Sequence, residues 1–152
     1  MHLILTLLLA VGGARGSLVV DAAWLAQHLN DPDLVLLHVG DKAGYEAAHI
    51  PGARFVAQQD VSVSQHDAKG LMLEMPPADD LRKRLETLGI SDNSRVIVYY
   101  GKDWVSPSTR IIFTLDYAGL GARSSLLDGA WTPGRATAAR RRRTCPPHAP
   151  AS

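Results

Sequence analysis

The 152-residue sequence has little cysteine and no hydrophobic run long enough to cross a membrane. Its one cysteine, Cys145, has no intrachain disulfide partner, which excludes a disulfide scaffold and any metal site built from several cysteines. The longest apolar stretch, residues 3–11, is too short for a transmembrane helix, which needs roughly 20 residues. We therefore predict no membrane span, no metal ion and no other cofactor.

The last residues, 132–152, lack acidic side chains and also lack Leu, Ile, Val, Phe, Tyr and Met. Such a segment cannot bury enough apolar surface to offset the entropy of ordering it, so we predict a disordered tail. The run Arg140 to Arg143 could bind phosphates of a nucleic acid or an acidic lipid surface. No folded basic face accompanies this run, so a solvated tail is the simpler interpretation and nucleic-acid binding is the alternative.

The first residues, 1–16, are typical of a signal peptide cleaved after Gly16. An apolar run is followed by the small residues Ala14 and Gly16, although no Lys or Arg precedes the run. We therefore expect the protein in the periplasm or secreted from the cell. If the N-terminus is misassigned, or if it forms an extra strand, a cytoplasmic location follows instead.

Residues 17–131 alternate apolar, β-branched segments with amphipathic ones. This order predicts one α/β domain of three layers, with a mainly parallel sheet flanked by helices. Strands are expected at residues 17–20, 34–39, 54–56, 96–100 and 125–127, and helices at 22–29, 42–48, 78–88 and from 106 to about 118.

A polar loop of some twenty residues, 57–77, separates the third expected strand from the helix that follows it. Loops of that length are uncommon in a compact domain and often face a partner. We expect Leu71, Met72 and Leu73 within this loop to fold back over apolar surface.

The stretch from Arg95 to Leu120 predicts a buried strand, a polar loop and an amphipathic helix in succession. Ser106 is expected to cap the helix, with Pro107 at its first position. Amide groups of the loop and first helical turn would then converge on a small site suited to an anion. His38, at the end of another buried strand, is more simply interpreted as a hydrogen-bonded structural residue than as a catalyst.

The segment from Tyr45 to Val56, YEAAHIPGARFV, resembles the signature of the rhodanese (sulfurtransferase) family. The similarity extends to the order of the flanking elements and to Leu127-Asp128-Gly129, so it covers about Ser17 to Trp131. The resemblance implies a rhodanese-like fold in which Tyr45, His49, Pro51 and Gly52 are structural. His49 is expected to brace the bend at Pro51 and Gly52 by hydrogen bonds.

Members of this family transfer sulfur through a cysteine thiolate that follows the strand of the stretch described above. In this sequence that position falls at Tyr100, or less naturally at Gly101, and neither residue can carry a persulfide. The pattern resembles the amino-terminal, non-catalytic domain of a two-domain thiosulfate sulfurtransferase. The change of composition at Ala130 and Trp131 would fit a truncated or frame-shifted version.

The resemblance implies a second, catalytic rhodanese domain as partner, and a small sulfur-containing anion as a ligand of the loop. The candidate binding residues are Gly101, Lys102, Asp103, Trp104 and Arg110. Arg110 could instead pair with Asp103 at the surface. An active sulfurtransferase is the first alternative, and a phosphatase of the same fold is weaker because no cysteine precedes Arg110 in the loop.

Overall fold

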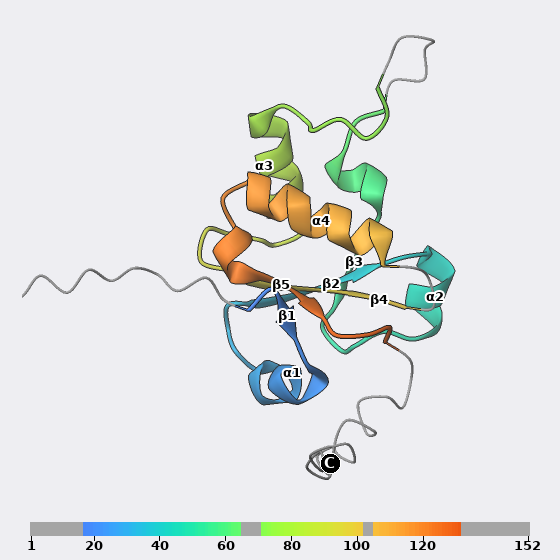
Figure 1. The fold of residues 1–152 in the computed structure, drawn as a ribbon, viewed down its shortest axis with the longest axis vertical. Helices are drawn as coiled ribbons and strands as arrows, with labels where there is room; N and C mark the ends of the chain where they lie inside the picture. Colours follow the sequence, from blue (N-terminus) through green and yellow to red (C-terminus); the bar gives the residue numbers. More distant parts are fainter. Residues whose placement is uncertain (1–16, 65–70, 102–104, 132–152) are drawn as a thin grey trace, which may run out of the picture.

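The computed structural model describes residues 17–64, 71–101 and 105–131. These residues form a five-stranded, wholly parallel sheet in the order β1-β5-β4-β2-β3, which confirms the predicted fold class (Figure 1). The expected signal peptide and basic tail lie outside the described residues. The strands are β1 (Val19–Val20), β2 (Leu34–Val39), β3 (Arg54–Val56), β4 (Arg95–Tyr100) and β5 (Ser124–Leu127).

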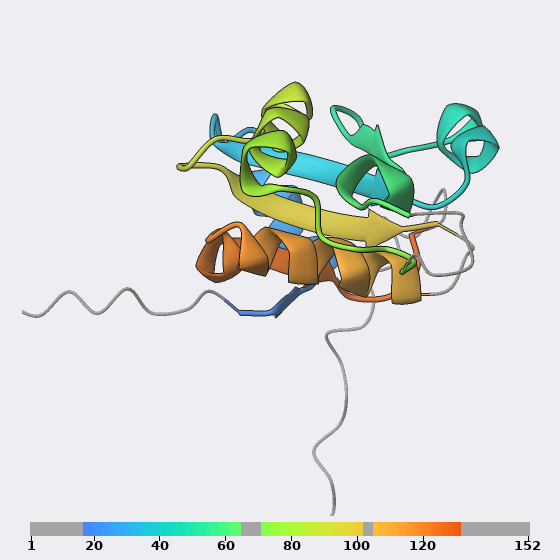
Figure 2. The ribbon, with the colours of Figure 1, turned by 90° about the horizontal axis from the view of Figure 1, so that it is seen from above.

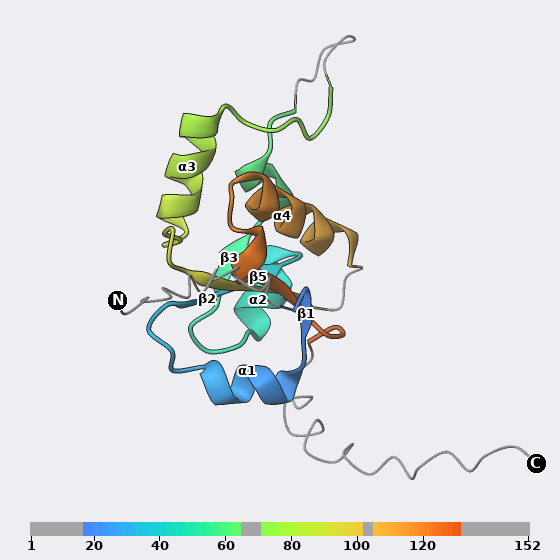
Figure 3. The ribbon, with the colours of Figure 1, turned by 60° about the vertical axis from the view of Figure 1, so that its left-hand side comes forward.

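Helices cover both faces of the sheet. Figure 3 shows α3 and α4 on one side and α1 on the other, and Figure 2 looks onto the sheet from above, with α3 and α4 on the near side. None of the helices in the described ranges is long and apolar enough to cross a membrane. The helices are α1 (Ala22–His28), α2 (Lys42–Ala47), α3 (Ala78–Thr87) and α4 (Ser106–Tyr117), with short 3-10 turns η1 (Gln58–Val61) and η2 (Gly121–Arg123).

The central strands β2 and β4 are buried on both faces because helices cover both sides of the sheet. Successive side chains along each strand point to opposite faces. In β4, Ile97 and Tyr99 join the core beneath α1, while Val96 and Val98 join the core beneath α3 and α4. All four side chains have essentially no exposed surface. The apolar sequence of β4 predicted a strand that is covered on both faces, and the structure confirms this.

Helix starts were predicted well at α1 and one residue late at α4. Asp21 caps α1, and its carboxylate accepts the Trp24 N–H at 2.7 Å. At α4 the cap residue is Val105 and no side chain makes a capping hydrogen bond, so the predicted Ser106 cap is wrong. Among the described residues, no side chain therefore caps the N–H groups of the first turn of α4.

The loop between β3 and α3 is more ordered than its polar composition indicated. It contains η1, and Val63 and Glu74 then pair as an isolated antiparallel bridge with two backbone hydrogen bonds of 3.0 and 2.7 Å. The expectation that Leu71 and Met72 cover apolar surface is wrong, because these side chains are 66% and 74% exposed. Figure 1 shows the described part of this segment above α4, away from the sheet.

Candidate functional site at the carboxyl ends of β2 and β4

The order of the strands reverses between β2 and β4, which are neighbours in the sheet. The chain leaves β2 toward β3 on one side, and it leaves β4 toward β5 on the other. In open parallel sheets, the divergence of two such connections opens a crevice at the carboxyl ends of the strands, where ligands bind. The topology therefore makes the carboxyl ends of β2 and β4, beside the loop after Tyr100, the candidate site.

Tyr100 is the last residue of β4, and it is only partly exposed. Its carbonyl accepts the Trp131 N–H at 2.8 Å, so the chain after β5 returns to the end of β4. Gly101 follows, and a β-carbon placed there would lie 3.6 Å from two atoms of the His38 ring. The buried His38 ring therefore forms the floor under the start of the loop.

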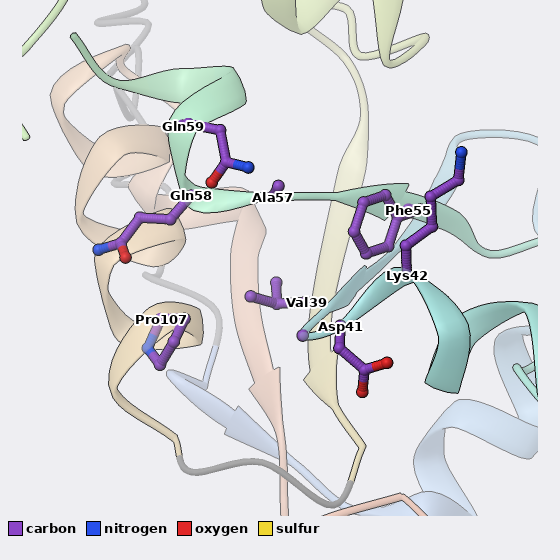
Figure 4. Close-up of a pocket in the computed structure, with 9 residues that line it drawn as sticks. Val39, Asp41, Lys42, Phe55, Ala57, Gln58, Gln59 and Pro107 are labelled. Atoms are coloured by element: carbon purple, nitrogen blue, oxygen red, sulfur yellow. The ribbon is translucent and has the colours of Figure 1, made fainter. Parts of the chain in front are cut away.

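A cavity of about 500 Å³ opens beside this loop, between the segments that follow β2 and β3 and the start of α4. Figure 4 shows Gln58 and Gln59 on one side, Phe55 and Lys42 on the other, and Val39 between them. The Asp41 carboxylate accepts the Gly44 N–H at 2.7 Å and so caps α2. The cavity combines an apolar floor with amide groups, one ammonium group and one carboxylate, a lining suited to a small polar ligand. Its walls are Val39, Gly40, Asp41, Lys42, Phe55, Ala57, Gln58, Gln59 and Pro107.

The segment that resembles the family signature is a hydrogen-bonded bend. The Tyr45 hydroxyl donates to the Ala53 carbonyl at 2.9 Å, and the Ala53 N–H donates to the Ile50 carbonyl at 2.9 Å. Gly52 has a φ of 81°, a backbone conformation that favours glycine. His49 donates from Nδ1 to the Tyr45 carbonyl at 2.8 Å and stacks on the Tyr45 ring, so it braces the end of α2 and not the bend itself.

Tyr99 connects this bend to β4. Its side chain is fully buried, and its hydroxyl oxygen accepts the Ile50 N–H at 3.0 Å. The ring also makes edge contacts with His38 and Trp131, at 4.9 and 6.0 Å between centroids. The sequence reasoning did not single out this residue, although strand alternation places it on the face opposite to Tyr100.

Burial raises the pKa of Tyr99 to about 12, although the Ile50 N–H acts in the opposite direction. Because the unfolded-state pKa is about 10, the folded protein holds the phenolic proton more tightly. This contribution to stability is complete below about pH 10 and is lost as the pH rises through the folded pKa, by about 1.4 kcal/mol for each unit of pKa difference. We expect urea unfolding between pH 9 and 12 to show the stability advantage of the wild type over Tyr99→Phe shrinking; a constant difference would contradict it.

Arg110 points toward the loop between β3 and α3. Its Nη2 donates to the Leu73 carbonyl at 2.6 Å, and its guanidinium carbon lies 5.6 Å from the centre of the Phe113 ring. The Leu73 backbone has a φ of 59°, and this hydrogen bond holds its carbonyl. Arg110 thus fastens the segment before α3 to α4, a role that its sequence position did not indicate.

The structure describes only two of the five predicted binding residues. Gly101 and Arg110 belong to the loop and helix that follow β4, whereas Lys102, Asp103 and Trp104 lie outside the described residues. Within the described ranges, no three His, Cys, Asp or Glu side chains are grouped so that they could hold a metal ion. The cavity residues Gln58 and Gln59 were missed, because nothing in a polar loop sequence shows that it turns back toward the sheet.

Comparison with known proteins places this architecture in a family. The family model described as "Rhodanese-like domain" matches residues 21–136. The thiosulfate sulfurtransferases of Azotobacter vinelandii and Pseudomonas aeruginosa are each 35% identical over 104 residues, which cover 67% of this chain and 36% of each relative. The crystal structure of the 3-mercaptopyruvate sulfotransferase SseA from Escherichia coli superposes with a TM-score of 0.63 at 25% identity, covering 76% of this chain and 46% of that one.

The family model covers most of the chain, and its range includes the signature segment and the loop after β4. The chain spans about a third of the length of these curated relatives. The chain belongs to the rhodanese-like domain family of sulfurtransferases.

Proposed function

We propose that this chain is a non-catalytic rhodanese-like domain that docks against a catalytic one, supplied by a longer version of the protein or by another chain. The observation that supports this most is the side chain at the end of β4. Tyr100 occupies the position at which sulfurtransferases of the resembled type place their cysteine, and the one cysteine of the sequence is Cys145, in the basic tail.

Sulfur transfer by this family needs a thiolate at that position. The thiolate attacks the outer sulfur of thiosulfate, the sulfur–sulfur bond breaks, and sulfite leaves while the sulfur remains as a persulfide. A phenol has a reference pKa of about 10 and cannot form a persulfide. The loop after β4 and the first turn of α4 would then form an anion-binding site that lacks a nucleophile.

The proposed ligand of this anion-binding site is a small sulfur-containing anion. The site lies on the surface that we expect to dock against the catalytic domain. The support is the start of α4, whose first-turn N–H groups have no side-chain cap, together with Lys102 in the loop. Arg110 already donates a hydrogen bond to the Leu73 carbonyl. Its proposed contribution to anion binding is therefore its positive charge near the first turn of α4. The proposal also places the protein outside the cytoplasm, on the strength of residues 1–16.

The test of catalytic inactivity is thiocyanate formation from thiosulfate and cyanide by the full chain. We expect no rate above the reaction without protein, for the wild type and for Cys145→Ser. Tyr100→Cys should not restore the rate, because a thiolate also needs amides aimed at the transition state. A rate that survives Cys145→Ser would favour the alternative, an active sulfurtransferase.

Docking is tested by adding the chain to a separately produced catalytic rhodanese domain. We expect the rate of thiocyanate formation by that domain to rise with the concentration of the chain and then to saturate. An unchanged rate at saturating concentrations would contradict the docking proposal without affecting the test of inactivity.

A further inference from the structure

The outer side of α4 carries a second row of large side chains besides the row that packs on the sheet. The inner row includes Ile111 and Leu115, which are 1% and 0% exposed. The outer row is Arg110, Phe113 and Tyr117, with spacings of three and four residues that keep them on one face of the helix. Phe113 and Tyr117 are 55% and 60% exposed, so the outer row has no apolar partner among the described residues.

This row has the composition of a protein interface. Tyr, Phe, Met and Arg are enriched in the centres of interfaces and among the residues whose truncation costs most affinity. The exposed Leu71 and Met72 are close in sequence to Leu73, whose carbonyl accepts the hydrogen bond from Arg110. Figures 1 and 2 show α4 at the periphery, with no described helix or strand over its outer side.

The spacing of the row makes it complementary to itself. Spacings of three and four residues are those of the seam through which two helices pack side by side. Phe113 lies almost midway between Arg110 and Tyr117, two turns apart. If a second α4 packs against the first in the antiparallel direction about a two-fold axis near Phe113, each Arg110 lies beside Tyr117 of the other copy, and the two Phe113 rings meet at the axis.

We propose that the chain forms a two-fold symmetric homodimer through the outer face of α4, with Arg110, Phe113 and Tyr117 at its centre. Each Arg110 guanidinium, which already lies over its own Phe113 ring, is then enclosed by Tyr117 of the partner subunit as a second aromatic face. Packing of the same surface patch from both copies is the usual arrangement of homodimers. This proposal shares Arg110 with the proposed anion site, but it uses none of the residues between Tyr100 and Val105 and requires no sulfur chemistry.

The proposal is tested by crosslinking single cysteines in the full chain carrying Cys145→Ser. In the dimer, the two copies of residue 113 lie next to the two-fold axis, so Phe113→Cys should form a disulfide dimer under mild oxidation. Thr109→Cys, exposed on the same helix, is the matched control. With a rise of 1.5 Å per residue, the two copies of residue 109 would be about 13 Å apart along the helices, beyond the roughly 7 Å limit between the Cα atoms of a disulfide.

We expect Phe113→Cys to crosslink rapidly and Thr109→Cys to stay monomeric, whereas equal rates, as random collisions would give, overturn the proposal. Sedimentation equilibrium of the uncrosslinked wild type supplies the second measurement. It should show a concentration-dependent dimer that Phe113→Glu abolishes and Lys83→Glu, on the exposed face of α3, leaves intact. A wild type that stays monomeric at every concentration, or a dimer that survives Phe113→Glu with an unchanged circular dichroism spectrum, also overturns it.

Discussion

Truncating Leu115 to alanine should lower the free energy of unfolding by about 2–5 kcal/mol, the range for removing a buried leucine side chain and leaving a cavity. Leu115 has no exposed surface and packs with Ile111 between α4 and the sheet. This packing holds α4, the helix that begins at the candidate site, against the sheet. Urea denaturation followed by circular dichroism measures the loss.

The matched control for this prediction is Phe113→Ala, a large-to-small change two residues away on the outer side of the same helix. Phe113 is 55% exposed in one copy of the chain, and surface substitutions usually stay within about 0.5 kcal/mol. The comparison should be made at a protein concentration low enough to keep the chain monomeric. Similar losses for the two variants would contradict the assignment of the two sides of α4.

Replacing Tyr99 with phenylalanine should cost about 1–3 kcal/mol, the range for leaving a buried polar group without its hydrogen-bond partner. The ring remains in the core, but the Ile50 N–H loses the hydroxyl oxygen that accepts it at 3.0 Å. This N–H belongs to the bend of the signature segment, so the loss also loosens the link between that bend and β4. Denaturation of the variant and of the wild type at pH 7 measures the difference.

Tyr45→Phe is the control for the Tyr99 variant, because it removes a hydroxyl that serves the same bend from a less buried position. The Tyr45 hydroxyl donates to the Ala53 carbonyl at 2.9 Å, and the Tyr45 side chain is only partly buried. We expect a loss of about 1 kcal/mol or less, the net value of one ordinary hydrogen bond. A larger loss than for Tyr99→Phe would show that the bend is held mainly from α2 and not from β4.

The strands were predictable because a strand that is buried on both faces has an almost continuous apolar sequence. Runs such as residues 34–39 and 95–100 hold few polar side chains, and segments with such a pattern are the centre of a parallel sheet. Their order along the chain, with helices between them, then fixes the parallel direction. The parallel direction and the two covered faces follow from these two facts, whereas the strand order came from the structure.

The loop between β3 and α3 was not predictable to the same degree, because its structure depends on contacts with distant residues. Arg84 donates to the carbonyls of Asp60 and Ser62, and Arg110 donates to that of Leu73. Such hydrogen-bond partners cannot be predicted from a short segment of sequence, because they lie far apart along the chain. For this reason, the exposure of Leu71 and Met72 and the place of Gln58 in the cavity wall could not be predicted.

The candidate site was also predictable only in part. Its place at the end of β4 followed from the succession of strand, loop and helix, and the absence of cysteine there could be stated from Tyr100 alone. The floor formed by His38 and the link from Tyr99 to Ile50 needed the three-dimensional register of β2 and β4, in which His38 lies beside Tyr99. Pairing across strands is a non-local property, and the sequence of either strand alone does not contain it.

The most direct test of the central claim, that Tyr100 leaves this rhodanese-like domain without a sulfur acceptor, is mass spectrometry of the Cys145→Ser chain after incubation with thiosulfate. The account predicts an unchanged intact mass, because no thiolate is present to hold the transferred sulfur. A gain of one sulfur atom on a peptide from residues 17–131 would contradict the account.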